Sequence, residues 1–310
     1  MTDTAHTPLP TFFTEMLAHD YDAADEERII AGLSTTRPTT LRANTLRATR
    51  EEVADALAAS GFAPESVSWF ADAFVLRSAG EANLWDTEVL KLGKIYVQSL
   101  SSMLPPLFME LEAGADVLDM CAAPGGKTCE IAALGAGRLH ITACEQSAVR
   151  ADKLEYNLRK QGAENVVVLR QDARKLDSFF SFDAVLLDAP CSGSGTLHVD
   201  DPKLGKRFSA ALVKDSCKKQ AALIAKALEI VKPGGMLVYS TCSVLKCENE
   251  EIVRAALARA NKRGSYKIEP IEAARIEGAP LLPSSIDGAL TVCPSELYEG
   301  FFMAKIRRYA

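Results

Sequence analysis

The stretch ADVLDMCAAPGGKTCEIAALG (Ala115–Gly135) indicates the fold class. ADVLDM predicts a buried strand, CAAPGG a glycine-containing turn, and KTCEIAALG a helix. Apolar strands keep alternating with helices from about Gly93 to the C-terminus, which is typical of a parallel sheet covered on both faces. The expected strands are 115–120, 139–145, 166–173, 182–190, 236–243 and 300–308, and the expected helices are 127–135, 148–162, 216–231 and 248–260.

The glycine turn is the first candidate binding site, because ligands of such sheets lie beyond the carboxyl ends of the strands. A phosphate loop needs a glycine where this chain has Cys121, and the spacing Gly-x-Gly-x-x-Gly of a dinucleotide fingerprint is missing. S-adenosylmethionine (SAM) carries an amino acid and no phosphate, so a glycine turn with close backbone approach suffices. Lys127 would then meet the methionine carboxylate or a substrate group.

Two acids at strand ends favour the SAM interpretation. Glu145 ends the second strand, where a carboxylate accepts hydrogen bonds from the ribose hydroxyls, and Asp172 ends the third, near the adenine amine. The alternative for each acid alone is an ordinary loop residue or a helix cap. Their position at successive strand ends makes them a candidate cofactor site.

Two further strands end in small polar loops that each hold one cysteine. FDAVLLDAPCSGSG (Phe182–Gly195) contains Cys191, and GGMLVYSTCSV (Gly234–Val244) contains Cys242. Carbon 5 of a pyrimidine is barely nucleophilic, but a thiolate that adds to carbon 6 makes carbon 5 enamine-like and able to take a methyl group. Two strand-end cysteines beside a SAM pocket suit this chemistry. The residues alone do not decide which cysteine attacks.

Composition is that of a globular protein, with 48% hydrophobic and 25% charged residues and a net charge of −6. No apolar run approaches the roughly 18 residues of a membrane span. No CxxC pair occurs and the four histidines are scattered, so we expect neither zinc nor disulfides, in a reduced intracellular protein. The global charge can hide local basic faces. Three basic groups are candidates: six residues between Asp200 and Gln220, the arginines 42, 47 and 50, and the residues 305, 307 and 308.

The first part of the chain reads as a separate unit. Residues 1–37 predict a helical lead that ends before Pro38. TTLRANTL (39–46) alternates like a strand, TREEVADALAASGF (49–62) predicts a capped helix ending at Gly61, and VSWFADAFVLRS (67–78) predicts one or two strands.

Six stretches together resemble the RNA 5-methylcytosine methyltransferases of the Nol/Nop/Sun family, which includes bacterial Fmu-type (RsmB/RsmF-like) members. The resemblance extends from about Arg37 to the C-terminus. It implies a Rossmann-like SAM-dependent methyltransferase sheet in residues 94–310 and a small α+β, RRM-like RNA-binding domain in residues 38–93. The stretches are RPTTLRANTL (37–46), YVQSLSSMLP (96–105), DMCAAPGGKT (119–128), LLDAPCSGSG (186–195), YSTCSV with ENE (239–250) and EGFFMAKI (299–306).

The resemblance also implies a role for each site residue. The cysteine of the Thr-Cys motif is the family's nucleophile and maps to Cys242, and that of the Pro-Cys motif, which assists product release, maps to Cys191. Asp188 would face the cytosine ring, with Lys127 beside it. The family often has an aspartate where Glu145 stands. The implied cofactor contacts are Cys121, Ala122, Ala123, Pro124, Gly125, Gly126, Lys127, Glu145, Asp172 and Asp188.

The implied substrate is RNA, ribosomal RNA first and transfer RNA second, held across the basic 203–219 segment and the small domain with the cytosine flipped out. We expect a monomer without metal or membrane association, cytoplasmic, or nucleolar or mitochondrial in a eukaryote. Extra N-terminal helical or C-terminal RNA-binding domains of some members are not expected here. The alternatives are a methyltransferase of the same fold acting on DNA or protein, and a non-catalytic RNA-binding assembly factor.

Overall fold

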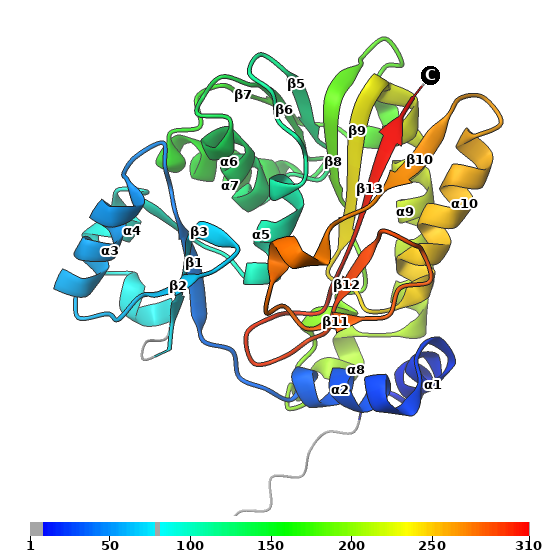
Figure 1. The fold of residues 1–310 in the computed structure, drawn as a ribbon, viewed down its shortest axis with the longest axis horizontal. Helices are drawn as coiled ribbons and strands as arrows, with labels where there is room; N and C mark the ends of the chain where they lie inside the picture. The colour runs from blue at the N-terminus through cyan, green and yellow to red at the C-terminus, as the bar shows by residue number, and fades with distance from the viewer. Residues whose placement is uncertain (1–8, 78–80, 310) are drawn as a thin grey trace, which may run out of the picture.

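The computed structural model describes residues 9–77 and 81–309, and it contains two sheets (Figure 1). The smaller sheet has four strands in the order β2-β3-β1-β4. The larger has nine, in the order β11-β12-β13-β9-β8-β5-β6-β7, with β10 paired to β13. Residues 1–8 of the predicted helical lead and residue 78 of the predicted strand lie outside the described residues.

The N-terminal lead forms two helices, α1 (Thr11–Asp20) and α2 (Ala23–Leu33). Asp22 separates them, because its side chain accepts a hydrogen bond from the Asp25 N–H at 2.9 Å and so starts a new helix. In the described part of the chain, the helical lead that the sequence predicts therefore consists of two helices. The buried faces of both helices pack with Phe208 and Val244 below the large sheet (Figure 1).

The small domain has the order βαββαβ, of which the sequence pattern predicted the first strand, the helix and the one or two strands that follow it. Its helix α3 starts with a capping box between Thr49 and Glu52, as the sequence predicts. All pairings in the sheet are antiparallel, and β4 pairs with the central strand β1. The predicted boundary after residue 93 therefore comes one strand too early. The elements are β1 (Thr39–Ala43), α3 (Arg50–Ala59), β2 (Glu65–Val67), β3 (Phe70–Leu76), the short helices η1 (Glu81–Leu84) and α4 (Glu88–Lys91), and β4 (Ile95–Val97).

The predicted strand–helix alternation is confirmed in the large sheet, where β7, β6, β5, β8 and β9 run parallel. Its elements are α5 (Leu100–Leu107), β5 (Asp116–Asp119), α6 (Gly126–Leu134), β6 (His140–Cys144), α7 (Ala148–Gln161), β7 (Val166–Leu169), η2 (Ala173–Lys175), β8 (Phe182–Asp188), η3 (Ser194–Thr196), α8 (Leu204–Arg207), α9 (Ala210–Ile230), β9 (Val231–Thr241), η4 (Lys246–Glu248) and α10 (Glu250–Ala260).

The last strand corrects the expectation of a wholly parallel sheet. After α10, the chain forms β10 (Tyr266–Glu269), η5 (Ala273–Ile276), β11 (Leu281–Leu282) and β12 (Leu290–Val292) before β13 (Phe301–Arg308). β13 is antiparallel to β9, with Phe302 opposite Thr241. β13 therefore starts at the edge of the sheet where the parallel strands end, which brings the residues just before it to that edge.

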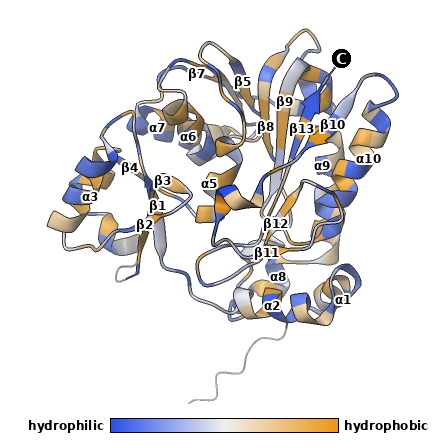
Figure 2. Cartoon of the chain, in the orientation of Figure 1, coloured by the Kyte–Doolittle hydropathy of each residue, from blue (hydrophilic) through white to orange (hydrophobic). Residues whose placement is uncertain are grey.

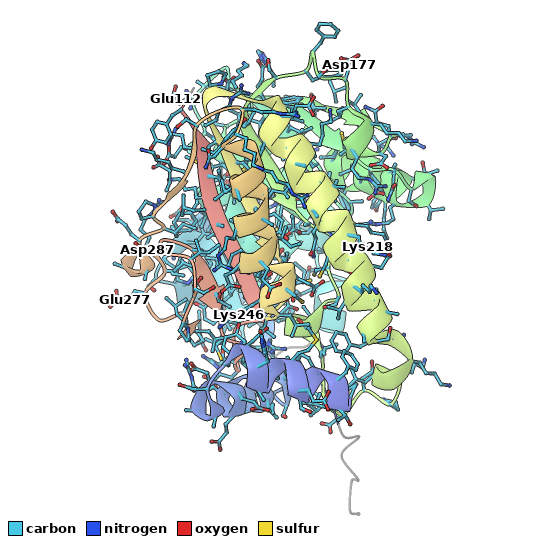
Figure 3. The ribbon with its side chains drawn as sticks, turned by 90° about the vertical axis from the view of Figure 1, so that its right-hand side faces the viewer. Glu112, Asp177, Lys218, Lys246, Glu277 and Asp287 are labelled. Atoms are coloured by element: carbon cyan, nitrogen blue, oxygen red, sulfur yellow. The ribbon has the colours of Figure 1, made fainter. Side chains whose placement is uncertain are left out.

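Helices cover both faces of the large sheet. One hydrophobic cluster joins α5, α6 and α7 to one face, and a second joins α9 and α10 to the other. Figure 3 shows α9 and α10 side by side over the strands. Figure 2 shows mixed hydrophilic and hydrophobic colour along α10, as expected for a helix with one buried face. Within the described part of the chain, no helix has the length and apolarity to cross a bilayer.

Candidate active site

The two cysteine loops meet at the carboxyl edge of the sheet. β8 and β9 are parallel neighbours that end at Asp188 and Thr241, so the loops after them lie side by side. The Cys191 and Cys242 sulfur atoms are 3.0 Å apart, and both cysteines are free. The pairing that the polar strand ends suggested is therefore present in the fold.

Gly195 fixes the separation of these loops from the start of β13. Its N–H donates to the Cys242 carbonyl at 3.0 Å, and its own carbonyl accepts from the Gly300 N–H at 2.8 Å. A Cβ on Gly195 would lie 2.1 Å from the Gly300 carbonyl oxygen. Only glycine permits this close approach of three loops.

Lys127 supplies a buried positive charge at the cysteines. Its Nζ lies 2.9 Å from Asp188 Oδ2 and 2.5 Å from Ser102 Oγ, and 5.7 Å from the ring centroid of Phe301. Burial lowers the pKa of Lys127, but the negative charges of Asp188, Cys242 and Asp119 outweigh burial and raise it. Lys127 is therefore protonated and stabilises negative charge on its neighbours.

The surroundings of the two cysteines differ in charge. The hydrogen bond with Cys242, burial, and the negative charges of Cys242 and Glu248 raise the pKa of the Cys191 thiol. Cys191 thus keeps its proton, and a hydrogen bond joins the two sulfur atoms. The Lys127 side chain and Cys242 line the same cavity.

One cavity at this edge, of about 230 Å³, suits the adenosyl part of SAM. The Glu145 carboxylate is held there by the Ser147 N–H at 2.8 Å and by Arg150 at 3.2 Å. Asp172 is paired with Arg174 at 2.6 Å, so an adenine amine would share this carboxylate with Arg174. The predicted residues that line the cavity are Cys121, Ala123, Glu145, Asp172, Asp188, Cys191 and Cys242.

The glycine turn itself fits a close ligand approach. Gly125 has a φ of +110°, a conformation that side chains disfavour, and Gly126 starts α6. Asp119 lies under the turn, where burial raises its pKa to about 6 even though the Thr128 hydroxyl donates to it at 2.7 Å. The carboxylate of an amino acid bound at this turn would accept hydrogen bonds from backbone N–H groups, and its ammonium group would donate to an acidic side chain.

A second cavity, of about 360 Å³, adjoins the first. The two cavities share Cys121, Ala123, Asp188 and Cys242. Two ligands bound in them would therefore meet at Cys242. The second cavity is lined by the remaining predicted turn residues except Gly125, namely Ala122, Pro124, Gly126 and Lys127. Its other lining residues come from β4 and the segment after it, from η3, and from the start of β13: Tyr96, Gln98, Ser99, Ser102, Thr196, Glu299 and Phe301.

Sequence reasoning missed several of these side chains. Tyr96 and Ser102 come from YVQSLSSMLP, and Glu299 and Phe301 from EGFFMAKI, two stretches whose resemblance to the family carried no residue roles. Arg150 had no distinguishing pattern at all, because it is one of several charged residues on a polar helix.

Members of two of the three suggested basic groups have partners within the protein. Arg42 is 1% exposed and donates to the Gly126 carbonyl at 2.9 Å. Lys305 and Arg307 are paired with Glu110. The 203–219 segment remains available on α8 and α9, where Lys219 lines the first cavity (Figure 3 labels its neighbour Lys218). Among the described residues, no three His, Cys, Asp or Glu side chains are grouped to hold a metal ion.

The comparisons with known proteins agree with this site. The sequence family described as "16S rRNA methyltransferase RsmB/F" matches residues 106–307, and the one described as "Methyltr_RsmF/B-like, ferredoxin-like domain" matches residues 9–83. Ribosomal RNA small subunit methyltransferase F of Shewanella woodyi is 34% identical over 283 residues, which cover 87% of this chain and 57% of that protein. The Erwinia tasmaniensis protein of that name is 34% identical over 318 residues, covering 100% of this chain and 66% of its own length.

A solved structure has the same fold. The structure titled "Methyltransferase Homolog Protein from Pyrococcus Horikoshii" superimposes with a TM-score of 0.79 at 29% identity, covering 97% of this chain and 100% of that one. The chain thus combines the domain of a methyltransferase family with a ferredoxin-like N-terminal domain. The chain belongs to the family described as 16S rRNA methyltransferase RsmB/F, as its motifs indicated. It spans about 57% of the length of its Shewanella relative.

Proposed function

We propose that this chain transfers a methyl group from SAM to carbon 5 of a cytosine in small-subunit ribosomal RNA. The observation that carries the proposal is the pair of free thiols 3.0 Å apart at the junction of two cavities. One cavity has the size and acidic groups for a cofactor, and the other is open to a flipped base. The relatives named above, small-subunit ribosomal RNA methyltransferases, support the choice of RNA.

The turn residues 121–127 with Glu145, Asp172 and Asp188 would hold SAM, which supplies an electrophilic methyl group when bound. Cys242, as thiolate, forms a bond to carbon 6 of the cytosine. Asp188 faces the cytosine ring, and Lys127 stabilises the negative charge that develops on it. The Lys127 Nζ lies 2.9 Å from Asp188 Oδ2. Once carbon 5 carries the methyl group, a base such as water takes the carbon-5 proton; the electrons of that C–H bond re-form the C5=C6 double bond, the carbon–sulfur bond breaks, and Cys242 leaves as thiolate. Cys191 lies where it can assist this release.

The small domain and the basic residues of the 203–219 segment would bind the RNA backbone, so binding should weaken as salt rises. In this proposal the protein works as a cytoplasmic monomer on ribosomal RNA. Transfer RNA is the second candidate substrate.

The test is to incubate the protein with tritiated SAM and unmodified 16S ribosomal RNA, with transfer RNA and duplex DNA in parallel. We expect label in 16S RNA as 5-methylcytosine, mapped by bisulfite sequencing. Cys242→Ala should give none, whereas Cys191→Ala should accumulate a denaturant-stable protein–RNA adduct. Cys293→Ala, a change at a cysteine buried against the N-terminal helices, is the control and should keep activity.

Other outcomes would point elsewhere. Label in DNA alone, with activity lost in Cys191→Ala and kept in Cys242→Ala, would indicate a DNA-type mechanism. RNA binding without any methyl transfer would indicate a non-catalytic assembly factor.

A further inference from the structure

Glu248 is a fully buried carboxylate that contacts both cysteine loops. It lies on η4, next to the start of α10, with no exposed surface. Its Oε1 accepts from the Ser192 N–H at 2.7 Å, and its Oε2 accepts from the Ser192 hydroxyl at 2.6 Å. The same Oε2 accepts from the Ser243 hydroxyl at 2.6 Å. Ser192 follows Cys191 and Ser243 follows Cys242, so one carboxylate ties together the residues after the two thiols.

The position of Glu248 is itself fixed from two sides. Its backbone carbonyl accepts from the Tyr239 hydroxyl at 2.6 Å, and Gln220 of α9 donates to Oε1 at 3.4 Å. Asn249 adds two bonds around Cys242, from the Thr241 hydroxyl at 2.5 Å and to the Ser243 carbonyl at 2.9 Å. The anchor of the two loops is therefore held by β9 and α9, which belong to the rigid part of the sheet.

A buried carboxylate with several hydrogen bonds costs free energy to desolvate, and a neutral apolar group could fill the same volume. Its contacts are directed at the backbone and hydroxyl groups that set the positions of the loops. Removing the carboxylate would leave the Ser192 N–H and two hydroxyls without their acceptor, so both loops would rearrange.

We propose that Glu248 is a positioning residue that holds Cys191 beside Cys242 in the geometry needed for adduct formation and release. The proposed role in catalysis rests on the proposed function of the two cysteines. The geometric part, that Glu248 sets the proximity of the thiols, can be measured without RNA or SAM.

The first measurement is the rate at which the thiol oxidant diamide joins Cys191 to Cys242, followed by mass spectrometry of unreduced peptides. We expect Glu248→Ala to slow this disulfide at least tenfold. Glu248→Gln should remain within about threefold of wild type, because its amide oxygen can accept from the Ser192 N–H and its amide nitrogen can donate to the two hydroxyls. Glu250→Gln is the matched control: Glu250 is equally buried in the same short segment, and its one side-chain partner is Ser284, at 3.2 Å.

The second measurement is methylation kinetics. Glu248→Ala should lower kcat by about 10²-fold, the size expected when reacting groups are displaced by about 1 Å, with little change in KM for SAM. Glu248→Gln should restore most of kcat. A general loss of folding would instead lower the melting temperature of every variant of this segment, Glu250→Gln included.

Each outcome bears on one of the two proposals. An unchanged disulfide rate in Glu248→Ala overturns the positioning role. If that variant does not fold, Ser192→Ala takes its place, since it removes one hydroxyl and keeps the carboxylate; a wild-type disulfide rate in folded Ser192→Ala also overturns the role. A slowed disulfide in a protein whose wild type methylates no RNA would leave the positioning role standing and refute the proposed function.

Discussion

Replacing Gly195 with alanine should disable the site by separating three loops. The added Cβ would lie 2.1 Å from the Gly300 carbonyl oxygen and 2.7 Å from the Gly300 Cα, both of them backbone atoms. Ordinary contact begins at 3.4 Å, so the two segments must move apart by 3.4 − 2.1 = 1.3 Å. No side-chain rotation can relieve this overlap. The movement breaks the bonds that link Gly195 to the Cys242 carbonyl and to the Gly300 N–H.

The free energy can be assembled from these parts. Overpacking costs about 1–3 kcal/mol, and the two hydrogen bonds contribute about 1 kcal/mol each. A destabilisation of roughly 3–5 kcal/mol lowers the melting temperature by roughly 6–10 °C in a chain of this size. The displacement of the Cys242 loop by about 1 Å should also lower kcat by about 10²-fold.

The assay is differential scanning calorimetry together with single-turnover methylation of 16S ribosomal RNA. Gly205→Ala is the matched control, because a Cβ there has no neighbour within 4 Å and the residue lies in α8. As a control for folding, that change should stabilise the protein slightly, by about 0.4–1 kcal/mol. A melting temperature of Gly195→Ala within 2 °C of wild type would refute the reasoning.

Two further changes test the buried charges. Lys127→Met keeps the side-chain length and removes the ammonium at Asp188, so single-turnover adduct formation with RNA should fall by about 10²-fold, and an unaltered rate would exclude Lys127 from the reaction. Burial raises the pKa of Glu130 from 4.5 to about 8, so the folded protein retains a proton that the unfolded chain releases, and stability should fall as pH rises between these values. Glu130→Gln cannot ionise, so the difference between its melting temperature and that of wild type should grow in favour of the variant from pH 5 to pH 8. An unchanged difference over this pH range would contradict the interpretation of Glu130 as a buried acid.

The strand–turn–helix order and the polar strand ends could be predicted because they are local patterns. Apolar runs of strand length, the capping box at Thr49 and the glycine at 125 each depend on neighbouring residues alone. Parallel strands also end at one edge by necessity, so the meeting of Cys191 and Cys242 followed from the pattern. Local sequence patterns were therefore enough to predict which residues lie together at the carboxyl edge of the sheet.

The positions that escaped prediction depend on contacts between distant segments. Arg42 looked like surface charge, yet it crosses from the small sheet to the first residue of α6 and donates to Gln98 Oε1 at 3.1 Å. The strand β4 has three residues and forms only because β1 offers it an edge. The partners of Arg42 and of β4 are too distant in the sequence for a local pattern to reveal them.

The assignment of roles to the two cysteines is the clearest case of such non-local information. Their loops are near-twins in sequence, but side chains from different segments surround each cysteine. Lys127, in the first turn of α6, interacts with Cys242, while the hydrogen bond with Cys242, burial, and the charges of Cys242 and Glu248 raise the pKa of Cys191. A mechanism with Cys191 as nucleophile would require it to lose its proton against the Glu248 carboxylate and without the ammonium that interacts with Cys242. The family resemblance therefore remains the ground on which Cys242, rather than Cys191, is proposed as the nucleophile, and the buried carboxylate beside Cys191 is compatible with that choice.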